Sequence, residues 1–355
     1  MAARHLHWQK GSVLIVSMVV LVLISAMAAR IVYQTRLELQ IQQQVNALTR
    51  LRALARGAAH QFASGLSSHV EETSNGLALP WWEEATEFTT LTLETGTAHI
   101  VPGDFSMPAV SEGDVALKSE PADEMKEPAT GLVDAESRLN INTATPEQFM
   151  AFPGFSNIIA EAIVSHRDAL VEEMGENPDT QVIAYRFILP RQKTEGEAGQ
   201  AGDTATLLYV ASPFRSVRDL LQVEGMTEEI LYEVIPDLDG APADFLTCCS
   251  NGRINLNTAP HPVLVAAGFS PEEANMLMSE RGSGTHFVDL SISGTVLPQI
   301  DEERWQRLEQ AITVRSSTFP LTVEVAHDAT GQMFTLVARV FLDEKAARFV
   351  SWREI

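Results

Sequence analysis

The stretch QKGSVLIVSMVVLVLISAMAA, Gln9–Ala29, contains eighteen consecutive uncharged residues that begin directly after Lys10 and Gly11. At about 1.5 Å per residue in a helix, this run measures roughly 27 Å, which matches the hydrocarbon core of a bilayer. Three interpretations fit it: a cleaved secretory signal, a plain membrane anchor, or a segment that is both processed and retained. Ala26-Met27-Ala28 would supply the small-x-small site of a secretory signal, with a mature N-terminus near Ala29.

The sequence after the uncharged run favours retention. An apolar stripe at helical spacing follows among Gln, Glu and Arg: Leu37, Ile41, Val45 and Leu48. No Pro or Gly interrupts it before Gly57. Residues 12–70 are therefore predicted to form one rod, half membrane-spanning and half amphipathic, and a cut near Ala28 would discard half of it.

The composition limits the classes of protein that the chain can belong to. With 355 residues, 45% of them hydrophobic, the chain can bury a large core and fill two or three domains. Its net charge of −22 disfavours binding to nucleic acid or to anionic lipid and suits a solvated periplasmic or extracellular body. The two cysteines, Cys248 and Cys249, are adjacent, so they cannot join distant parts of the fold and are expected to be thiols.

The chain beyond the rod divides by pattern into strands, helices and strands again. Residues 77–141 are predicted to form the first part of a sheet, with strands in EFTTLTLETGTAHIVP and in Gly131–Ile141, and with a solvated loop at 103–130 between them. Residues 142–315 are predicted to be helical, with capping boxes at Thr145–Gln148 and Ser270–Glu273 and polar loops within 171–206. Residues 316–355 alternate over three strands. The predicted class is α+β.

An internal repeat lies in the helical part. RLNINTATPEQFMAFPGFSNIIAEAIVSHR, residues 138–167, matches RINLNTAPHPVLVAAGFSPEEANMLMSER, residues 253–281, with one residue fewer before the central Gly. Each copy places N-[IL]-N-T-A before a helix, a Gly turn and a second helix, which resembles a helix-hairpin-helix unit.

DNA-binding helix-hairpin-helix proteins are the rival interpretation, since competence-type DNA receptors combine a membrane anchor with such a domain. The second Gly of the DNA-binding hairpin is absent at Gly154-Phe155-Ser156, Gly225-Met226-Thr227 and Gly268-Phe269-Ser270, and a Cβ there hinders the approach of a phosphate. Glutamates surround the hairpins where phosphate binding requires Lys or Arg: Glu161, Glu224, Glu228, Glu229, Glu272 and Glu273. A structural use of the motif is therefore favoured.

The combination of leader, uncharged run, strands and repeated motifs resembles the K family of type II secretion minor pseudopilins (GspK-like), over essentially the whole chain. The resemblance implies a pilin-like N-terminal membrane-spanning helix packed on an antiparallel sheet, with a large all-helical insertion of the helix-hairpin-helix or SAM-like type. It implies that residues 1–11 are a prepilin leader, that a prepilin peptidase cuts after Gly11, and that Ser12 is then N-methylated. Val16 stands at the fifth mature position, where most pseudopilins have Glu and K members have an apolar residue.

The resemblance also implies a cellular role. It predicts a single-pass protein of the bacterial inner membrane with its bulk in the periplasm, acting in protein transport at the pseudopilus tip. The implied partners are the I and J minor pseudopilins, the major pseudopilin, the prepilin peptidase, inner-membrane secretion proteins and exported cargo, and no nucleic acid.

No catalytic motif is visible in the sequence: HExxH, a Walker loop and GxSxG are all missing, so no enzyme activity is expected. Two acidic clusters are candidate calcium ligands: Asp237, Asp239 and Asp244, and Glu172, Glu173, Glu176 and Asp179. The resemblance to the K family implies that calcium could bind in the inserted region, whereas solvated acidic loops are the alternative for both clusters.

Overall fold

The computed structural model describes residues 8–72, 90–93, 96–101, 133–176, 184–189, 206–284, 286–290, 296–297, 300–327, 333–342 and 347–354. The chain divides into two compact units, Met1–Ala53 and Leu54–Ile355. The loop predicted at 103–130 lies outside the described residues.

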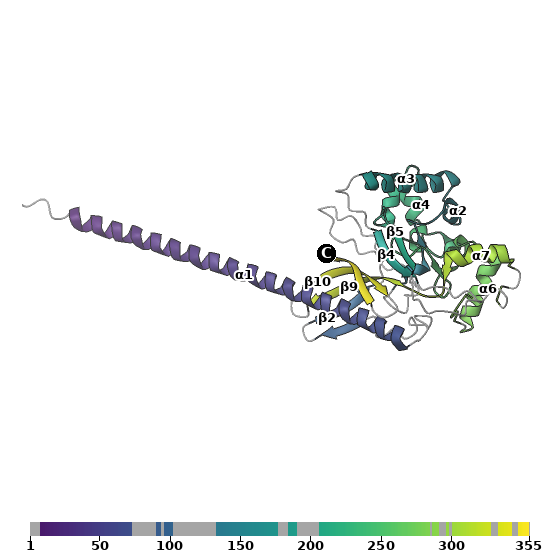
Figure 1. Ribbon diagram of the computed structural model, residues 1–355. Coiled ribbons are helices and arrows are strands. Elements are labelled where there is room, and N and C mark those ends of the chain that lie inside the picture. The colour runs from purple at the N-terminus through teal and green to yellow at the C-terminus, as the bar shows by residue number, and fades with distance from the viewer. Residues whose placement is uncertain are drawn as a thin grey trace, which may run out of the picture. The chain divides into compact units, whose positions relative to one another are not determined.

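The first unit consists of most of helix α1, which spans Trp8–Glu72 and continues into the second unit (Figure 1). Its apolar side chains from Leu14 to Ile31 are 47–70% exposed. One candidate membrane span is found among the described residues, and it lies in this helix, which is long and apolar enough to cross a bilayer. The predicted rod over residues 12–70 is thus one continuous helix.

The C-terminal part of α1, from Leu54 onward, packs into the second unit. Four alanines and two larger residues on it are at most 4% exposed: Ala55, Ala58, Ala59, Phe62, Ala63 and Leu66. The alanines let a helix approach its neighbours closely. Ser67 Oγ accepts a hydrogen bond of 2.8 Å from the amide of Ala347, and Arg56 forms an ion pair with Glu354, so this part of α1 is bonded to the last strand.

A five-stranded antiparallel sheet forms the body against which this part of α1 packs (Figure 1). Its strands are, in spatial order, β1 (Thr90–Leu93), β2 (Gly96–Val101), β9 (Thr318–His327), β10 (Met333–Leu342) and β11 (Ala347–Glu354). Phe319, Leu321, Val323 and Val325 of β9 are all 0% exposed, and they share one face by the two-residue period of a strand. Because β2 pairs directly with β9, the chain between them is inserted between two neighbouring strands.

The described part of this inserted region, residues 133–317, is mainly helical. Its helices are α2 (Pro146–Phe149), α3 (Asn157–Glu176), α4 (Glu228–Tyr232), α5 (His261–Ala266), α6 (Pro271–Gly282), α7 (Glu302–Ala311) and the 3₁₀ turns η2 (Ala135–Ser137), η3 (Val217–Gln222), η4 (Pro236–Leu238) and η5 (Pro242–Phe245). Its strands form three pairs: β3 (Leu139–Asn140) with β6 (Leu246–Thr247), β4 (Ala184–Leu189) with β5 (Thr206–Ala211), and β7 (Ile254–Asn255) with β8 (Ile312–Thr313).

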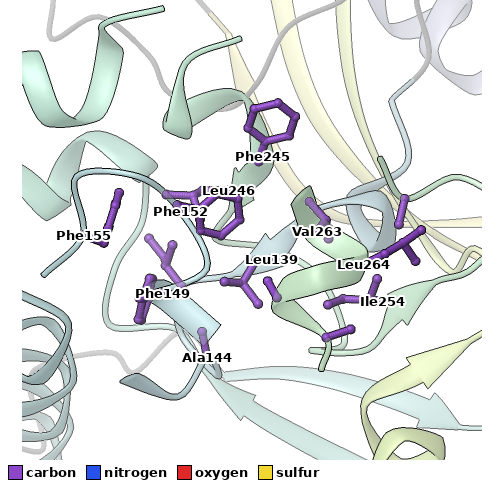
Figure 2. Packing of buried hydrophobic residues seen from close by; sticks show 14 of the residues in the cluster. Leu139, Ala144, Phe149, Phe152, Phe155, Phe245, Leu246, Ile254, Val263 and Leu264 are labelled. Carbon is purple, nitrogen blue, oxygen red and sulfur yellow. The ribbon is translucent and has the colours of Figure 1, made fainter. Parts of the chain in front are cut away.

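One apolar cluster unites the inserted region. It contains residues of the first repeat, such as Leu139, Phe149 and Phe152, and residues of the second, such as Val263 and Leu264 (Figure 2). The stacked rings of Phe149 and Phe155 lie 5.9 Å apart between centroids. The two repeats therefore share a core and are not separate modules.

Both predicted capping boxes are confirmed. Thr145 and Gln148 exchange hydrogen bonds before α2, and Ser270 and Glu273 do so before α6. Helix α7 lies within the region predicted to be helical, and the three predicted C-terminal strands are β9, β10 and β11.

Two local predictions are wrong. The strand predicted over 131–141 is, from residue 133 on, a 3₁₀ turn followed by the two-residue strand β3, because the Asp134 side chain accepts from the amide of Glu136 and closes a tight turn. The expectation of an all-helical insertion also fails, because the runs AYRFIL and TLLYVA form the antiparallel pair β4–β5 inside 171–211.

Candidate functional site

The predicted processing residues lie near the start of α1. The backbone of Gly11, Ser12 and Val16 is helical, and the Val16 side chain is 59% exposed. All three belong to the first unit, in which no large apolar side chain from Leu14 to Leu48 is buried. An apolar helix surface of this length requires lipid or other apolar helices around it.

The repeated N-x-N-T motifs occupy equivalent positions in the inserted region. The second Asn of each copy holds two distant segments together through three side-chain hydrogen bonds. Asn142 Nδ2 donates to the carbonyl oxygens of Phe214 and Cys248, both at 3.0 Å, and its Oδ1 accepts from the Phe214 amide. Asn257 Nδ2 donates to the carbonyl oxygens of Phe287 at 2.8 Å and Val314 at 2.9 Å, and its Oδ1 accepts from the Phe287 amide.

The first Asn of each copy closes the turn that follows it. Asn140 Oδ1 accepts from the amide of Asn142, and Asn255 Oδ1 accepts from that of Asn257, at 2.9 and 3.0 Å. These asparagines are nearly fully buried, and their donors and acceptors are matched. The motif is therefore a structural device that orders buried backbone.

The duplication extends beyond the motif visible in the sequence. Arg167, near the end of the first copy, donates to the carbonyl oxygen of Ala144, and Arg281 in the second copy donates to that of Ala259. Burial lowers the pKa of Arg281. In both copies, a Cβ added at the hairpin Gly would meet one apolar side chain of a later helix: Ile230 of α4 at Gly154, and Leu308 of α7 at Gly268.

Sequence reasoning missed the partners of the motif. Phe214 and Phe287, and the parallel strands β6 and β8, complete the two halves of the duplication. The only sequence signals for the strands are the dipeptides Leu-Thr and Ile-Thr, which are too short to recognise.

Side chains of the protein itself bond to the backbone groups of the hairpin at Gly268. The amide of Ser270, at the position of the missing second Gly, donates at 2.7 Å to Glu273 Oε2. Arg304 donates to both oxygens of Glu273 and to the carbonyl oxygen of Gly268. Burial acts to raise the pKa of Glu273, but the hydrogen bonds from Arg304 and Ser270 outweigh it and lower the pKa. The Glu273 carboxylate therefore takes up a backbone N–H group at this helix N-terminus, where an anion such as phosphate would otherwise bind.

The predicted calcium clusters are not assembled into a site among the described residues, which contain no group of three or more His, Cys, Asp or Glu side chains suited to a metal. Asp244 Oδ2 accepts from the Ala241 amide at 2.8 Å and so closes a turn. Asp179 and the side chain of Glu176 lie outside the described residues.

A search of protein-family models gives no match to this chain. The endonuclease/exonuclease/phosphatase family domain-containing protein 1 of Rattus norvegicus is 24% identical over 201 residues. The match covers 40% of this chain and spans 35% of the length of that relative.

Among solved structures, this chain is similar to a chain in the crystal structure of the GspK-GspI-GspJ complex from the type 2 secretion system of enterotoxigenic Escherichia coli. The match covers 88% of this chain and 99% of the solved chain, with a TM-score of 0.52 and 14% sequence identity. This chain has the fold of that solved chain. The predicted α+β class and the GspK-like arrangement are confirmed at the level of the fold.

Proposed function

We propose that the chain is a minor pseudopilin of a type II secretion system, held in the bacterial inner membrane by residues 12–29 with its folded part in the periplasm. The observation that carries the proposal is the fold, which matches a chain of the GspK-GspI-GspJ complex over 88% of this chain. The exposed apolar surface of α1 supports it, because a subunit of a helical fibre needs such a surface to contact lipid before assembly and other helices afterwards.

We further propose that the chain occupies the tip of the pseudopilus with the I and J minor pseudopilins and promotes fibre assembly. Its remaining partners are the major pseudopilin, the prepilin peptidase, inner-membrane secretion proteins and exported cargo. The role is assembly, and no catalysis is assigned to it. The large insertion between β2 and β9 suits the tip of the fibre, because a bulky head obstructs the placement of another subunit above it.

Val16 supports the tip position by an electrostatic argument. Cleavage after Gly11 leaves a charged amine on Ser12 at membrane depth, and an unpaired charge there costs roughly 2.5–3.5 kcal/mol or more. In a growing fibre, a Glu at mature position five pairs with the amine of a neighbouring subunit. A subunit placed first has no earlier neighbour, so an apolar residue such as Val16 avoids an unpaired buried carboxylate.

Crosslinking of assembled pseudopili tests the tip position. The wild-type chain should occur once per fibre, crosslinked to the I and J subunits, and should not polymerise alone. Val16→Glu should still insert but should lose its exclusive place at the tip, whereas the matched variant Val16→Leu should behave as the wild type. Finding the wild-type chain repeated along the shaft would contradict the proposal.

A DNA-binding assay tests the rival function, a membrane-anchored DNA receptor. The acidic chain should bind no DNA at moderate salt, and micromolar, salt-dependent binding would overturn the assignment.

A further inference from the structure

Two buried acidic side chains lie where the inserted region meets the sheet. Asp134 is 4% exposed and Glu136 is 0% exposed, and both belong to the turn η2 at the start of the described inserted region. A buried carboxylate needs hydrogen bonds or an opposite charge to offset the loss of solvation, so its neighbours show what holds it.

Glu136 bonds to the segment that leaves the inserted region. Its Oε1 accepts from Ser317 Oγ at 2.6 Å, and its Oε2 accepts from the amides of Ser317 at 3.1 Å and Thr318 at 2.9 Å. Thr318 is the first residue of β9, so Glu136 ties the incoming segment directly to a strand of the sheet.

Asp134 bonds to the second repeat and to the same outgoing segment. Its Oδ2 accepts from Asn255 Nδ2 at 3.1 Å, from Ser316 Oγ at 2.6 Å and from Thr258 Oγ1. Asn255 and Thr258 belong to the second N-x-N-T motif, so this carboxylate links the motif to both ends of the inserted region.

The connection between the repeats reaches the same point. Asn251, which lies between β6 and β7, donates from Nδ2 to Ser317 Oγ at 3.0 Å. The incoming segment, the connection between the repeats and the outgoing segment therefore meet at Ser317. We call this group, Asp134, Glu136, Asn251, Asn255, Ser316 and Ser317, the clasp.

The charge inside the clasp is unusual. The charged side chain beside Glu136 is Asp134, which lies on the same turn, η2. The groups that bond to the two carboxyl groups from the second motif and from the start of β9 are uncharged amides and hydroxyls. Burial, followed by the neighbouring Asp134 carboxylate, raises the pKa of Glu136 to about 8, although Ser317 and Thr318 act to lower it. At pH 7 the Glu136 carboxyl group is therefore mostly protonated.

We propose that the clasp is a proton-dependent latch, which holds the inserted region on the sheet while Glu136 is protonated and loosens when a second buried negative charge forms beside Asp134. Two adjacent carboxylates in a site closed to water repel each other strongly once both are ionised. The repulsion between the Asp134 and Glu136 carboxylates then opposes the hydrogen bonds that join the three segments.

The direction of the pH effect follows from the two states of Glu136. In the unfolded chain its pKa has the ordinary value of 4.5, and in the folded chain the pKa is about 8. The stability that the protonated clasp contributes is therefore complete below pH 4.5, declines as the pH rises, and is lost once the pH passes about 8.

Hydrogen exchange of the full-length protein in nanodiscs tests the latch. Between pH 6.5 and pH 9.5, and after correction for intrinsic exchange rates, segments 133–140 and 314–320 should lose protection by about tenfold or more. This change is expected because the stabilising contribution of the protonated clasp falls about tenfold for each pH unit between pH 6.5 and the folded-state pKa of about 8, and it does not change further above that pKa. The segment 334–338 of β10 should keep its protection, since it pairs with residues 321–325 of β9, which lie beyond the clasp.

Variants separate the latch from a general effect of alkaline pH. Glu136→Gln removes the titrating carboxyl group, so it should abolish the loss of protection. Asp134→Asn removes the neighbouring carboxylate but leaves Glu136 buried, so it should reduce the loss without abolishing it. Glu224→Gln, an exposed carboxylate in the same region, should leave it unchanged. Constant protection of the wild type across this range, or an equal loss in a folded Glu136→Gln protein, would overturn the proposal. Hydrogen exchange of the wild type across this pH range needs no variant, so it tests the proposal even if a variant fails to fold.

Discussion

Asn142 and Asn257 make the same three side-chain hydrogen bonds in the two halves of the inserted region, each to both backbone polar groups of a Phe and to one carbonyl oxygen of a strand-end residue. The inserted region is therefore a duplicated unit with a shared apolar core. The amide groups of these two asparagines are matched by backbone partners inside the fold, which makes each asparagine sensitive to replacement.

Replacing either asparagine with alanine should destabilise the full-length protein by about 3 kcal/mol, because the buried amide and carbonyl groups lose their partner. Denaturant unfolding in detergent measures this change. Asn157→Ala is the control, since Asn157 is exposed and bonds only to Glu161 among the hydrogen bonds described, and it should cost less than about 0.5 kcal/mol. Equal costs at Asn142 and Asn157 would show that the motif does not order the core.

Two glycines should respond in opposite ways to alanine. Gly268 has a φ of +109°, and a Cβ there would lie 3.2 Å from Leu308 Cδ2, so Gly268→Ala should destabilise by roughly 1–3 kcal/mol. Gly57 lies inside α1, and a Cβ added there would have no neighbouring atom within 4 Å, so Gly57→Ala should stabilise by about 0.5–1 kcal/mol. Unfolding curves of both variants check the signs, and a stabilised Gly268→Ala protein would contradict the described turn.

The ion pair between Glu273 and Arg304 should contribute to stability in a pH-dependent way. Glu273→Gln should cost roughly 1–3 kcal/mol at pH 7, because a partly buried, charge-assisted contact is lost. The pKa of Glu273 is lowered in the fold, so this contribution is present above pH 4.5 and is lost as the pH falls through the folded-state pKa. The difference between variant and wild type should therefore shrink in acid.

Glu228→Gln provides the control for that experiment. Glu228 pairs with Arg218 at 3.5 Å, but both side chains are well exposed, so its loss should cost less than about 1 kcal/mol. If Glu273→Gln and Glu228→Gln lower the free energy of unfolding equally at pH 7, the buried position of Glu273 has no special role.

Removing residues 1–35 should give a soluble, folded, acidic protein. The removed segment carries the uncharged run with most of the exposed apolar side chains, whereas the core of the second unit begins beyond it. Circular dichroism and size-exclusion chromatography without detergent measure the outcome. Aggregation that persists with the I and J partners present would show that the first unit contributes to folding.

Much of the local structure could be predicted because it depends on neighbouring residues. Capping boxes, the glycine turns and the alternation of β9 to β11 are encoded within a few positions, and α1 follows from its uncharged run and helical stripe. The β4–β5 pair was missed because its strands are short and separated by polar residues. The segment before Leu139 was mistaken for a strand because its alternation hides the side-chain turn at Asp134.

The long-range contacts could not be predicted from one sequence. Asn142 and Asn257 were visible as a repeat, but Phe214 and Phe287 follow them at unequal distances in the chain, so their equivalence appears only in the fold. The meeting of Asp134, Glu136 and Ser317 joins the two ends of the inserted region, and no local pattern marks it.

The mature N-terminus tests the central claim most directly. Intact-mass measurement and N-terminal sequencing of the protein from its native membrane should find a chain that begins at Ser12, carrying one added methyl group. Gly11→Leu should retain the leader, because cleavage beside this residue requires a small side chain, whereas Gly57→Ala should be processed normally. A mature chain that begins near Ala29, or a Gly11→Leu protein with the same mature mass as the wild type, would contradict the assignment as a pseudopilin.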